Sequence, residues 1–174
     1  MNKEELIDIY YDNSFLTPYF KQFKKYLGDE PKVVELNCGY GENLSKMHEL
    51  GATCLGIDTD ESVIDEAKQR NPGITFLVND LTLDIKSIDI FKGVILNDVY
   101  SKVDLMSLGL IFNNVYGSLD KEGYLFIISK NEYSKEAIET IMNKKFIFVE
   151  ELIGNEKISF YIYKKVELDP HFLL

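Results

Sequence analysis

Residues 33–42 read Val-Val-Glu-Leu-Asn-Cys-Gly-Tyr-Gly-Glu, and this stretch decides the fold. Val33 to Leu36 form a short β-branched run after the breaker Asp29-Glu30-Pro31, a pattern that predicts a strand. Gly39 and Gly41 then allow a tight turn and the close approach of a ligand to the backbone, where a Cβ would collide. A helical pattern begins directly after the turn. Strand, glycine turn and helix therefore follow one another without a gap.

The same alternation continues along the chain. Strands are predicted over 33–36, 53–57, 74–78, 91–96 and 123–129, and helices over 42–50, 62–70, 104–119 and 134–143. An earlier helix is expected to begin with Thr17 as N-cap and Pro18 at N1 and to stop at Gly28. The helix over 104–119 should bury Leu105, Leu108, Ile111, Phe112, Val115 and Leu119. Strands that alternate with helices have crossover connections, which means a parallel sheet covered on both faces.

The last two β-rich runs depart from this rule. Residues 146–153 and 157–166 are separated only by Gly154-Asn155-Glu156, which predicts a hairpin. We therefore expect an α/β three-layer sandwich: a mostly parallel seven-stranded sheet with a C-terminal antiparallel hairpin and helices on both faces. The 174 residues fit one domain, with residues 1–30 as an N-terminal helical lid or flank, 31–166 as the core and 167–174 as a tail.

Composition excludes several classes of function. The chain has 19 Lys and Arg against 29 Asp and Glu, a formal net charge of −10, which argues against sequence-independent binding to nucleic acid or anionic lipid. No apolar run approaches the roughly 18 residues of a membrane span, and no signal peptide precedes the core, so we expect a cytoplasmic protein. Cys38 and Cys54 lack the short spacings of a zinc site, which favours buried thiols and no metal.

An acidic residue ends the second predicted strand. Gly56-Ile57-Asp58 places a carboxylate 19 residues after Gly39, where a ribose diol could donate two hydrogen bonds to it. Asp58 could instead be an N-terminal partner of the helix that follows. The glycine turn and Asp58 fit either a dinucleotide or an adenosyl cofactor. Leu44 stands where the dinucleotide fingerprint needs its third glycine, which argues against NAD.

At this point the sequence resembles the class I S-adenosylmethionine-dependent methyltransferases. Residues 33–41 resemble the first motif of that family, Gly56-Ile57-Asp58 the second, and Asn79-Asp80-Leu81 the acid after the third strand. The resemblance extends from about Val33 to Val166, because the sheet of this family also ends in an antiparallel hairpin. It implies a methyltransferase with S-adenosyl-L-methionine as cofactor.

The resemblance also implies a set of cofactor-binding residues. Glu35 and the turn from Cys38 to Gly41 would face the methionine moiety, Asp58 would hold the ribose hydroxyls, and Asp80 would approach the adenine amino group with Leu81 beside the ring. The implied set further contains Asn37, Thr59 and Asn97. Asp80 could equally be a turn residue. The sequence departs from the family pattern at Asn37, often Gly or Ala, at Lys92, often an acid, and at Glu122, often Pro.

Residues 96–101, Leu-Asn-Asp-Val-Tyr-Ser, follow the fourth strand, where acceptor residues of the family normally lie. Asp98 is the best candidate for a general base, and Tyr100 for a residue that orients the acceptor. The absence of Asn-Pro-Pro-Tyr and of Pro-Cys here argues against adenine, glutamine and cytosine C5 as acceptors. His48 and His171 are not credible bases. A small molecule or a protein remains as the acceptor.

Two further expectations concern activity and access. The alternative to an enzyme is a non-catalytic protein that binds an adenosyl ligand or acts as a scaffold on the same fold. The aromatic segment around Tyr10 to Tyr19 is expected to lie over the cofactor cleft as a lid, because no later insertion supplies a cover.

Overall fold

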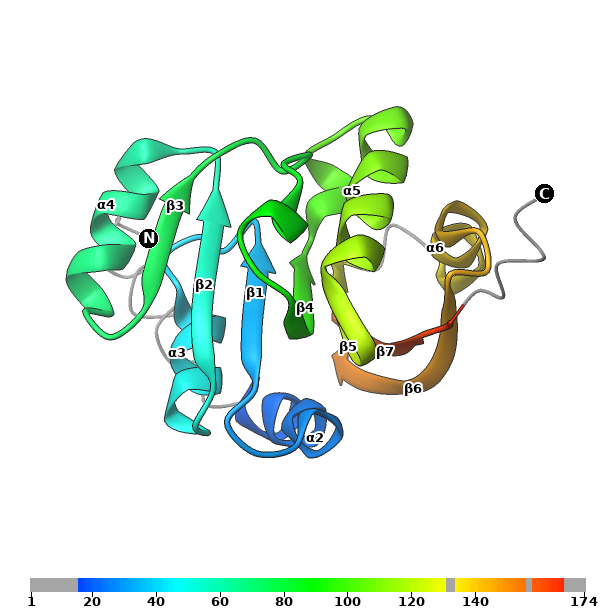
Figure 1. The fold of residues 1–174 in the computed structure, drawn as a ribbon, viewed down its shortest axis with the longest axis horizontal. Coiled ribbons are helices and arrows are strands. Elements are labelled where there is room, and N and C mark those ends of the chain that lie inside the picture. Colours follow the sequence, from blue (N-terminus) through cyan, green and yellow to red (C-terminus); the bar gives the residue numbers. More distant parts are fainter. Residues whose placement is uncertain (1–15, 131–133, 156–157, 168–174) are drawn as a thin grey trace.

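The computed structural model describes residues 16–130, 134–155 and 158–167. Its centre is a seven-stranded sheet in the order β3-β2-β1-β4-β5-β7-β6 (Figure 1). The strands are β1 (Lys32–Leu36), β2 (Thr53–Asp58), β3 (Thr75–Val78), β4 (Phe91–Asn97), β5 (Leu119–Lys130), β6 (Phe146–Asn155) and β7 (Ile158–Lys165). The first five strands pair in parallel, and β7 pairs antiparallel with both β5 and β6. The predicted parallel sheet with a C-terminal hairpin is therefore confirmed.

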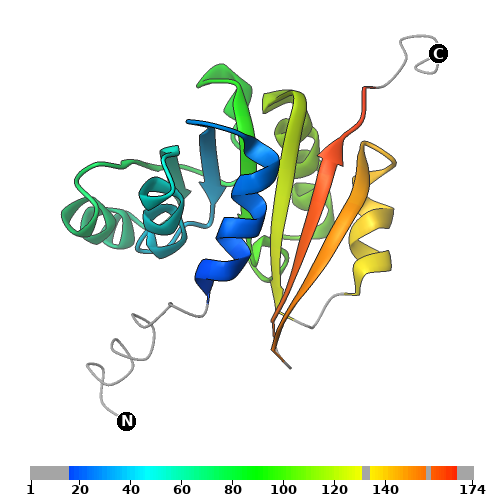
Figure 2. The ribbon, with the colours of Figure 1, turned by 90° about the horizontal axis from the view of Figure 1, so that it is seen from below.

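Helices cover both faces of the sheet. They are α2 (Thr17–Leu27), α3 (Glu42–Glu49), α4 (Glu61–Arg70), α5 (Leu105–Ser118) and α6 (Lys135–Met142). The apolar residues of α2, α3 and α4 pack on one face, and those of α5 and α6 pack on the other (Figures 1 and 2). Side-chain caps start three of these helices, because Asp60, Asp104 and Ser134 each accept a hydrogen bond from a backbone amide of the first turn.

Aromatic stacking attaches α2 to the sheet. The rings of Phe23 and Phe126 are stacked with their centroids 4.8 Å apart, and Tyr19 stacks on Phe160 at 4.3 Å. The hydroxyl of Tyr19 donates to the Ile153 carbonyl at 3.1 Å, near the end of β6 and just before the turn to β7. Because this turn lies at the end of β5, α2 begins near the edge where the parallel strands end. Tyr10 and Tyr11, on which the lid prediction also rests, lie outside the described residues.

Two local predictions are wrong. Thr17 does not cap α2: Leu16 occupies the N-cap position with no side-chain hydrogen bond, its backbone already lies in the right-handed helical region, and Thr17 is the first helical residue. Leu105 is 73% exposed, whereas Leu108, Ile111 and Phe112 are buried. Leu105 is the first residue of α5, directly after the Asp104 cap, so it lies one turn before the part of the helix that meets the sheet.

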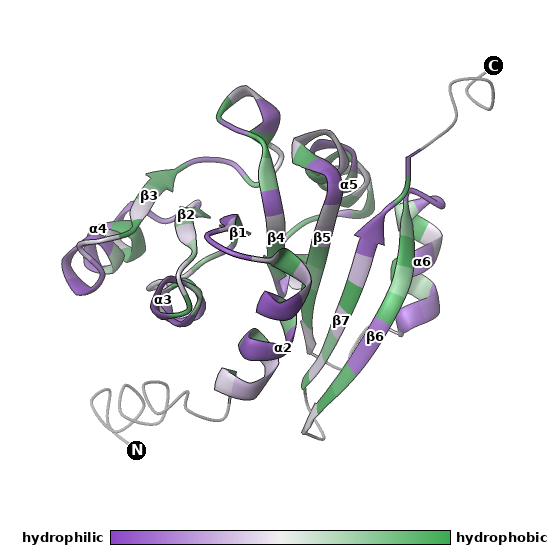
Figure 3. Ribbon diagram, turned by 60° about the horizontal axis from the view of Figure 1, so that its bottom comes forward, coloured by the Kyte–Doolittle hydropathy of each residue, from purple (hydrophilic) through white to green (hydrophobic). Residues whose placement is uncertain are grey.

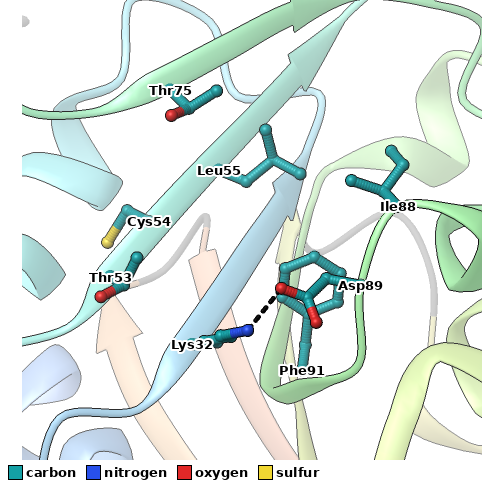
Figure 4. A pocket seen from close by; sticks show the side chains of 8 residues that line it. All are labelled: Lys32, Thr53, Cys54, Leu55, Thr75, Ile88, Asp89 and Phe91. Carbon is teal, nitrogen blue, oxygen red and sulfur yellow. Dashed lines mark hydrogen bonds and ion pairs between the residues drawn. The ribbon is translucent and has the colours of Figure 1, made fainter.

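The connection from β3 to β4 contains only one turn of 3-10 helix, η2 (Ile85–Ser87). Beside it lies a pocket of about 200 Å³ lined by Lys32, Thr53, Cys54, Leu55, Thr75, Ile88, Asp89 and Phe91 (Figure 4). The Lys32 ammonium and the Asp89 carboxylate form an ion pair of 2.5 Å at this pocket. Most lining residues come from the beginnings of β1, β2, β3 and β4, so the pocket opens at the edge opposite the ends of these strands.

Strand β3 forms one edge of the sheet and pairs only with β2. Its last residues carry hydrophobic colour in Figure 3, although Leu77 is 36% and Val78 43% exposed. The missing crossover helix leaves this part of the sheet less covered than its centre, where Val34, Val94 and Ile127 are fully buried.

Candidate functional site

The glycine turn, residues 37–41, joins the end of β1 to α3. Asn37, Gly39 and Gly41 all have left-handed backbones, with φ of 61°, 54° and 85°. Hydrogen bonds fix the turn to the strands on both sides. The Cys38 amide donates to the Ile57 carbonyl of β2 at 3.1 Å, and the Asn37 side-chain amide donates to the Asn97 carbonyl of β4 at 2.6 Å. Asn37 thus holds the turn to the end of β4.

The two glycines have different surroundings. A Cβ added to Gly39 would meet no atom within 4 Å, whereas one added to Gly41 would meet the Phe76 ring at 2.6 Å. The same ring lies 2.5 Å from a Cβ on Gly56. The expectation that both glycines admit a ligand needs correction at Gly41, because the space beside its Cα is filled by Phe76. Only Gly39 presents an open backbone.

The Asp58 side chain faces the glycine turn. It is 7% exposed, its Oδ2 accepts the Gly39 amide at 2.9 Å, and its Oδ1 accepts the Asp60 amide at 3.2 Å. Asp60 caps α4 by accepting the Ser62 and Val63 amides, and Asp58 reaches the start of that helix only through the Asp60 amide, so its alternative role as an N-terminal partner of α4 stays a prediction. An ionised carboxylate has about four acceptor positions, so Asp58 can accept two further hydrogen bonds. The neighbouring Thr59 is exposed.

Glu35 lies fully buried beneath the turn. The Asn43 side chain donates to its Oε1 at 2.6 Å, and its Oε2 has no hydrogen-bond partner among the described residues. Burial, reinforced by the negative charges of Glu42 and Asp58, raises the pKa of Glu35 well above its ordinary value, while the Asn43 hydrogen bond opposes the shift. A buried polar atom without a partner is a candidate contact for a ligand.

Both cysteines are free and buried, as predicted. Burial raises the pKa of Cys54 to about 12 and raises the pKa of Cys38 further. The thiolate is the reactive form of cysteine, so neither residue is suited to be a nucleophile.

Asp80 and Leu81 follow β3 at the same edge of the sheet. Asp80 is exposed, and its Oδ1 accepts both the Thr82 amide at 2.7 Å and the Thr82 hydroxyl at 2.6 Å, bonds that lower the pKa of its carboxyl group. Asp80 is therefore a turn residue, which was the alternative left open by the sequence, and its Oδ2 can still accept a hydrogen bond from another donor. Leu81 is 4% exposed and packs in the core beside β2 and η2.

The candidate catalytic residues lie after β4. Asp98 is 7% exposed with a left-handed φ of 51°, and its Oδ2 accepts the Ser101 hydroxyl at 2.9 Å. Tyr100, in the 3-10 turn η3 (Val99–Ser101), is 3% exposed, and its ring centroid lies 6.2 Å from that of Phe112. Burial raises the pKa of Tyr100 well above its ordinary value. The two roles stay predictions, and the packing of Tyr100 favours a structural part for it.

Sequence reasoning missed three residues that shape this edge. Phe76 lies under the glycine turn, Asn43 holds Glu35, and the Asn71 side chain donates to the Tyr40 carbonyl at 2.9 Å. Phe76 occupies a buried position of a predicted strand, which is the one signal that pointed to it. His48 is exposed, as expected, and its Nδ1 lies 3.2 Å from the Ala52 carbonyl oxygen, whereas His171 lies outside the described residues.

Within the described ranges, no three His, Cys, Asp or Glu side chains gather as a metal site would require. The helices of these ranges also include none with the length and apolar character needed to cross a bilayer.

Comparison with known proteins gives a consistent result. The model of a family described as methyltransferase domain matches residues 34–127, more than half of the chain. This range begins in β1, contains the glycine turn, Asp58 and Asp80, and ends in β5. No curated protein sequence shows significant similarity to the chain.

Solved structures share the fold at low sequence identity. A Pyrococcus horikoshii protein is 18% identical with a TM-score of 0.79, covering 95% of this chain and 92% of that one. The N-methyltransferase NodS of Bradyrhizobium japonicum, in complex with S-adenosyl-L-homocysteine, is 18% identical with a TM-score of 0.75 and 90% coverage of both chains. The magnesium protoporphyrin IX methyltransferase of Synechocystis, with bound S-adenosylmethionine, is 16% identical with a TM-score of 0.72, covering 87% of this chain and 76% of that one.

Proposed function

The chain belongs to the methyltransferase domain family, and on that premise we propose that it is an enzyme of the methyltransferase class that transfers a methyl group from S-adenosylmethionine to a small-molecule or protein acceptor. One observation carries the proposal. The open backbone of Gly39 lies beside the buried carboxylate of Asp58, whose two oxygens each keep an acceptor position. The two ribose hydroxyls of the cofactor could donate to these two oxygens, because no side chain obstructs the approach at Gly39. The cytoplasmic location expected from the sequence stays a prediction.

The residues present fit an adenosyl cofactor on further grounds. Fully buried Glu35 offers an oxygen without a partner beneath the glycine turn, which suits a positively charged methionine moiety. Asp80 keeps an oxygen for a further donor and follows β3, the strand paired with β2, which ends at Asp58. We assign the ribose to Asp58 and the adenine amino group to Asp80. Leu81 lines the adenine end from the core side.

The remaining predicted residues surround the methionine end. Asn37, Cys38 and Gly39 form the first half of the glycine turn, and Asn97 ends the neighbouring strand β4. Asn37 keeps these two segments in contact through its hydrogen bond to the Asn97 carbonyl. Thr59 follows Asp58 and lies exposed beside the ribose position. These residues are proposed to bind and orient the cofactor.

The cofactor supplies an activated methyl group on a sulfonium. The chain has to align an acceptor atom with that methyl group, and alignment alone contributes about 7–11 kcal/mol to such reactions. Where the acceptor carries a proton, Asp98 is the proposed base, because it directly follows Asn97, the last residue of β4, at the same edge of the sheet. The Ser101 hydroxyl and the left-handed backbone fix the Asp98 carboxylate in place.

Isothermal titration calorimetry with S-adenosylmethionine and S-adenosylhomocysteine tests the proposal. Wild-type protein should bind both, and Asp58→Ala should weaken binding by about 1–3 kcal/mol, or about 5- to 150-fold, because hydrogen bonds to a charged group are lost. Asp60→Ala is the matched control, since it removes a neighbouring carboxylate that caps α4 without facing the glycine turn. Absence of any heat or thermal shift at millimolar ligand rejects the proposal.

A screen of small-molecule and protein acceptors then separates enzyme from binding protein. Transfer of a labelled methyl group to any acceptor establishes turnover. Tight cofactor binding without turnover across the screen favours the non-catalytic alternative.

A further inference from the structure

We propose that Glu35 is protonated in the free protein and releases its proton to solvent when S-adenosylmethionine binds, so that Glu35 makes the site selective for a cationic ligand. The inference rests on the proposed function and adds to it a property of the same site. It concerns the charge that the ligand must carry rather than the identity of the acceptor.

Geometry gives the first reason. Glu35 lies in β1, the third of the seven strands across the sheet, between Gly56 of β2 and Ile95 of β4, and none of its surface is exposed. An ionised carboxylate accepts about four hydrogen bonds, whereas the described residues offer Glu35 two neutral side-chain amides, that of Asn43, bonded to Oε1, and that of Asn97. A fully buried charge with so few donors is costly, and protonation removes that cost.

The surrounding charges give the second reason. On the α3 side the nearest titratable group is Glu42, and at the end of β2 it is Asp58, both acids. The thiols of Cys38 in the glycine turn and Cys54 in β2 stay neutral because burial raises the pKa of each. From β4 the facing side chain is the neutral amide of Asn97, whose hydrogen bond, like that of Asn43, partly opposes the rise of the Glu35 pKa. Burial and these acids together raise the pKa of Glu35 well above its ordinary range.

A cationic ligand reverses this balance. S-adenosylmethionine carries an ammonium and a sulfonium, and a positive charge close to a buried carboxyl group favours its ionised form. Binding therefore converts Glu35 to the carboxylate, and one proton leaves for each ligand bound. S-adenosylhomocysteine has lost the sulfonium charge, so it should drive less ionisation than the methyl donor. Product release would then be accompanied by reprotonation of Glu35.

Calorimetry of the full chain measures this proton directly. Titrations with S-adenosylmethionine at pH 6, where the α-amino group of the ligand is protonated, are repeated in buffers of different ionisation enthalpy. The slope of the observed heat against buffer enthalpy gives the number of protons released. We expect a value near one for wild type, a smaller value with S-adenosylhomocysteine, and a value near zero for Glu35→Gln, which keeps the shape of the protonated side chain.

Glu42→Gln is the matched control and should keep most of the release, because it removes a nearby acid that is not beneath the turn. A second measurement needs no variant: the wild-type dissociation constant should fall by up to tenfold for each pH unit gained, as release of one proton requires. Binding with zero slope in wild type, or undiminished release in Glu35→Gln, overturns the inference and leaves the proposed function intact. Failure of wild type to bind either ligand instead rejects the proposed function.

Discussion

Alanine at Gly39 and at Gly41 should have opposite consequences, although the two glycines are separated by one residue. Both have left-handed backbones, which cost an L-residue roughly 1–2 kcal/mol. At Gly39 the new Cβ meets no atom, so the free energy of unfolding should fall by that amount only. At Gly41 the Cβ would lie 2.6 Å from the Phe76 ring, and overpacking adds about 1–3 kcal/mol. Gly41→Ala should therefore lose about 2–5 kcal/mol.

Ligand binding should follow the reverse order. The Cβ of Gly39→Ala projects into the open space beside Asp58, where the cofactor is expected to approach, so the dissociation constant for S-adenosylhomocysteine should rise by more than tenfold. Gly41→Ala should bind nearly as wild type wherever it is folded, because its Cβ points at Phe76.

Urea unfolding and calorimetry at a temperature where both variants are folded measure the two quantities. Gly51→Ala is the control for backbone strain alone: its φ is 89°, a Cβ there meets nothing within 4 Å, and it lies beyond the far end of α3. Equal losses of stability at Gly39 and Gly41, or intact binding in Gly39→Ala, would refute the reasoning.

Three further variants test other parts of the structure. Asn37→Gly keeps the left-handed turn but loses the hydrogen bond to the Asn97 carbonyl, so the dissociation constant for S-adenosylhomocysteine should rise about 2- to 10-fold, or about 0.5–1.5 kcal/mol. Asn143→Gly, at another left-handed Asn, is the control and should leave this dissociation constant unchanged. Ser134→Ala removes the α6 cap and should lower the unfolding free energy in urea by about 0.5–2 kcal/mol. A raised pKa of Glu35 means that the folded chain binds more protons than the unfolded chain, so the free energy of unfolding of wild type falls as the pH rises from the unfolded to the folded pKa of Glu35. Glu35→Gln lacks this loss, so it should be more stable than wild type at pH 8, and the difference should shrink towards pH 4.

For each of these three predictions, one outcome would contradict the reasoning. Equal affinities for the Asn37 and Asn143 variants would show that the bond between the turn and β4 is dispensable. An unchanged urea midpoint for Ser134→Ala would mean that the cap contributes nothing, and parallel pH profiles of wild type and Glu35→Gln would mean that Glu35 titrates normally.

The order and type of the elements could be predicted from the sequence because they depend on local periodicity. The run of strands and helices from Lys32 onwards and the final hairpin follow from patterns that lie within about ten residues. The element ends were harder. Leu105 fits the apolar period of α5 but lies at its first residue, where the helix no longer faces the sheet. Periodicity says which face is apolar and not where the contact with the sheet begins.

The candidate site was predictable where it depends on spacing along the chain. The glycine turn and Asp58 follow two adjacent strands, so the topology brings them together. The contacts between Gly41 and Phe76 and between Asn43 and Glu35 depend on how distant side chains pack, and no local pattern contains them. The burial of Tyr100 is of the same kind, because it depends on core residues distant in the chain, Phe112 of α5 among them.

The connection from β3 to β4 lacks a crossover helix, and this affects local unfolding at that edge of the sheet. Strand β3 has four residues and a single neighbour, so its hydrogen bonds should exchange with solvent through local openings far less costly than global unfolding. Asp80 and Leu81 follow this strand, so the adenine end of the proposed cofactor site would lie beside a short edge strand. A ligand held by both Asp58 and Asp80 would bridge β2 and β3 and suppress those openings by mass action. The cofactor would then stabilise the edge of the sheet against local opening. The backbone amides of β3 should therefore show the largest gain in protection from hydrogen exchange when the cofactor binds.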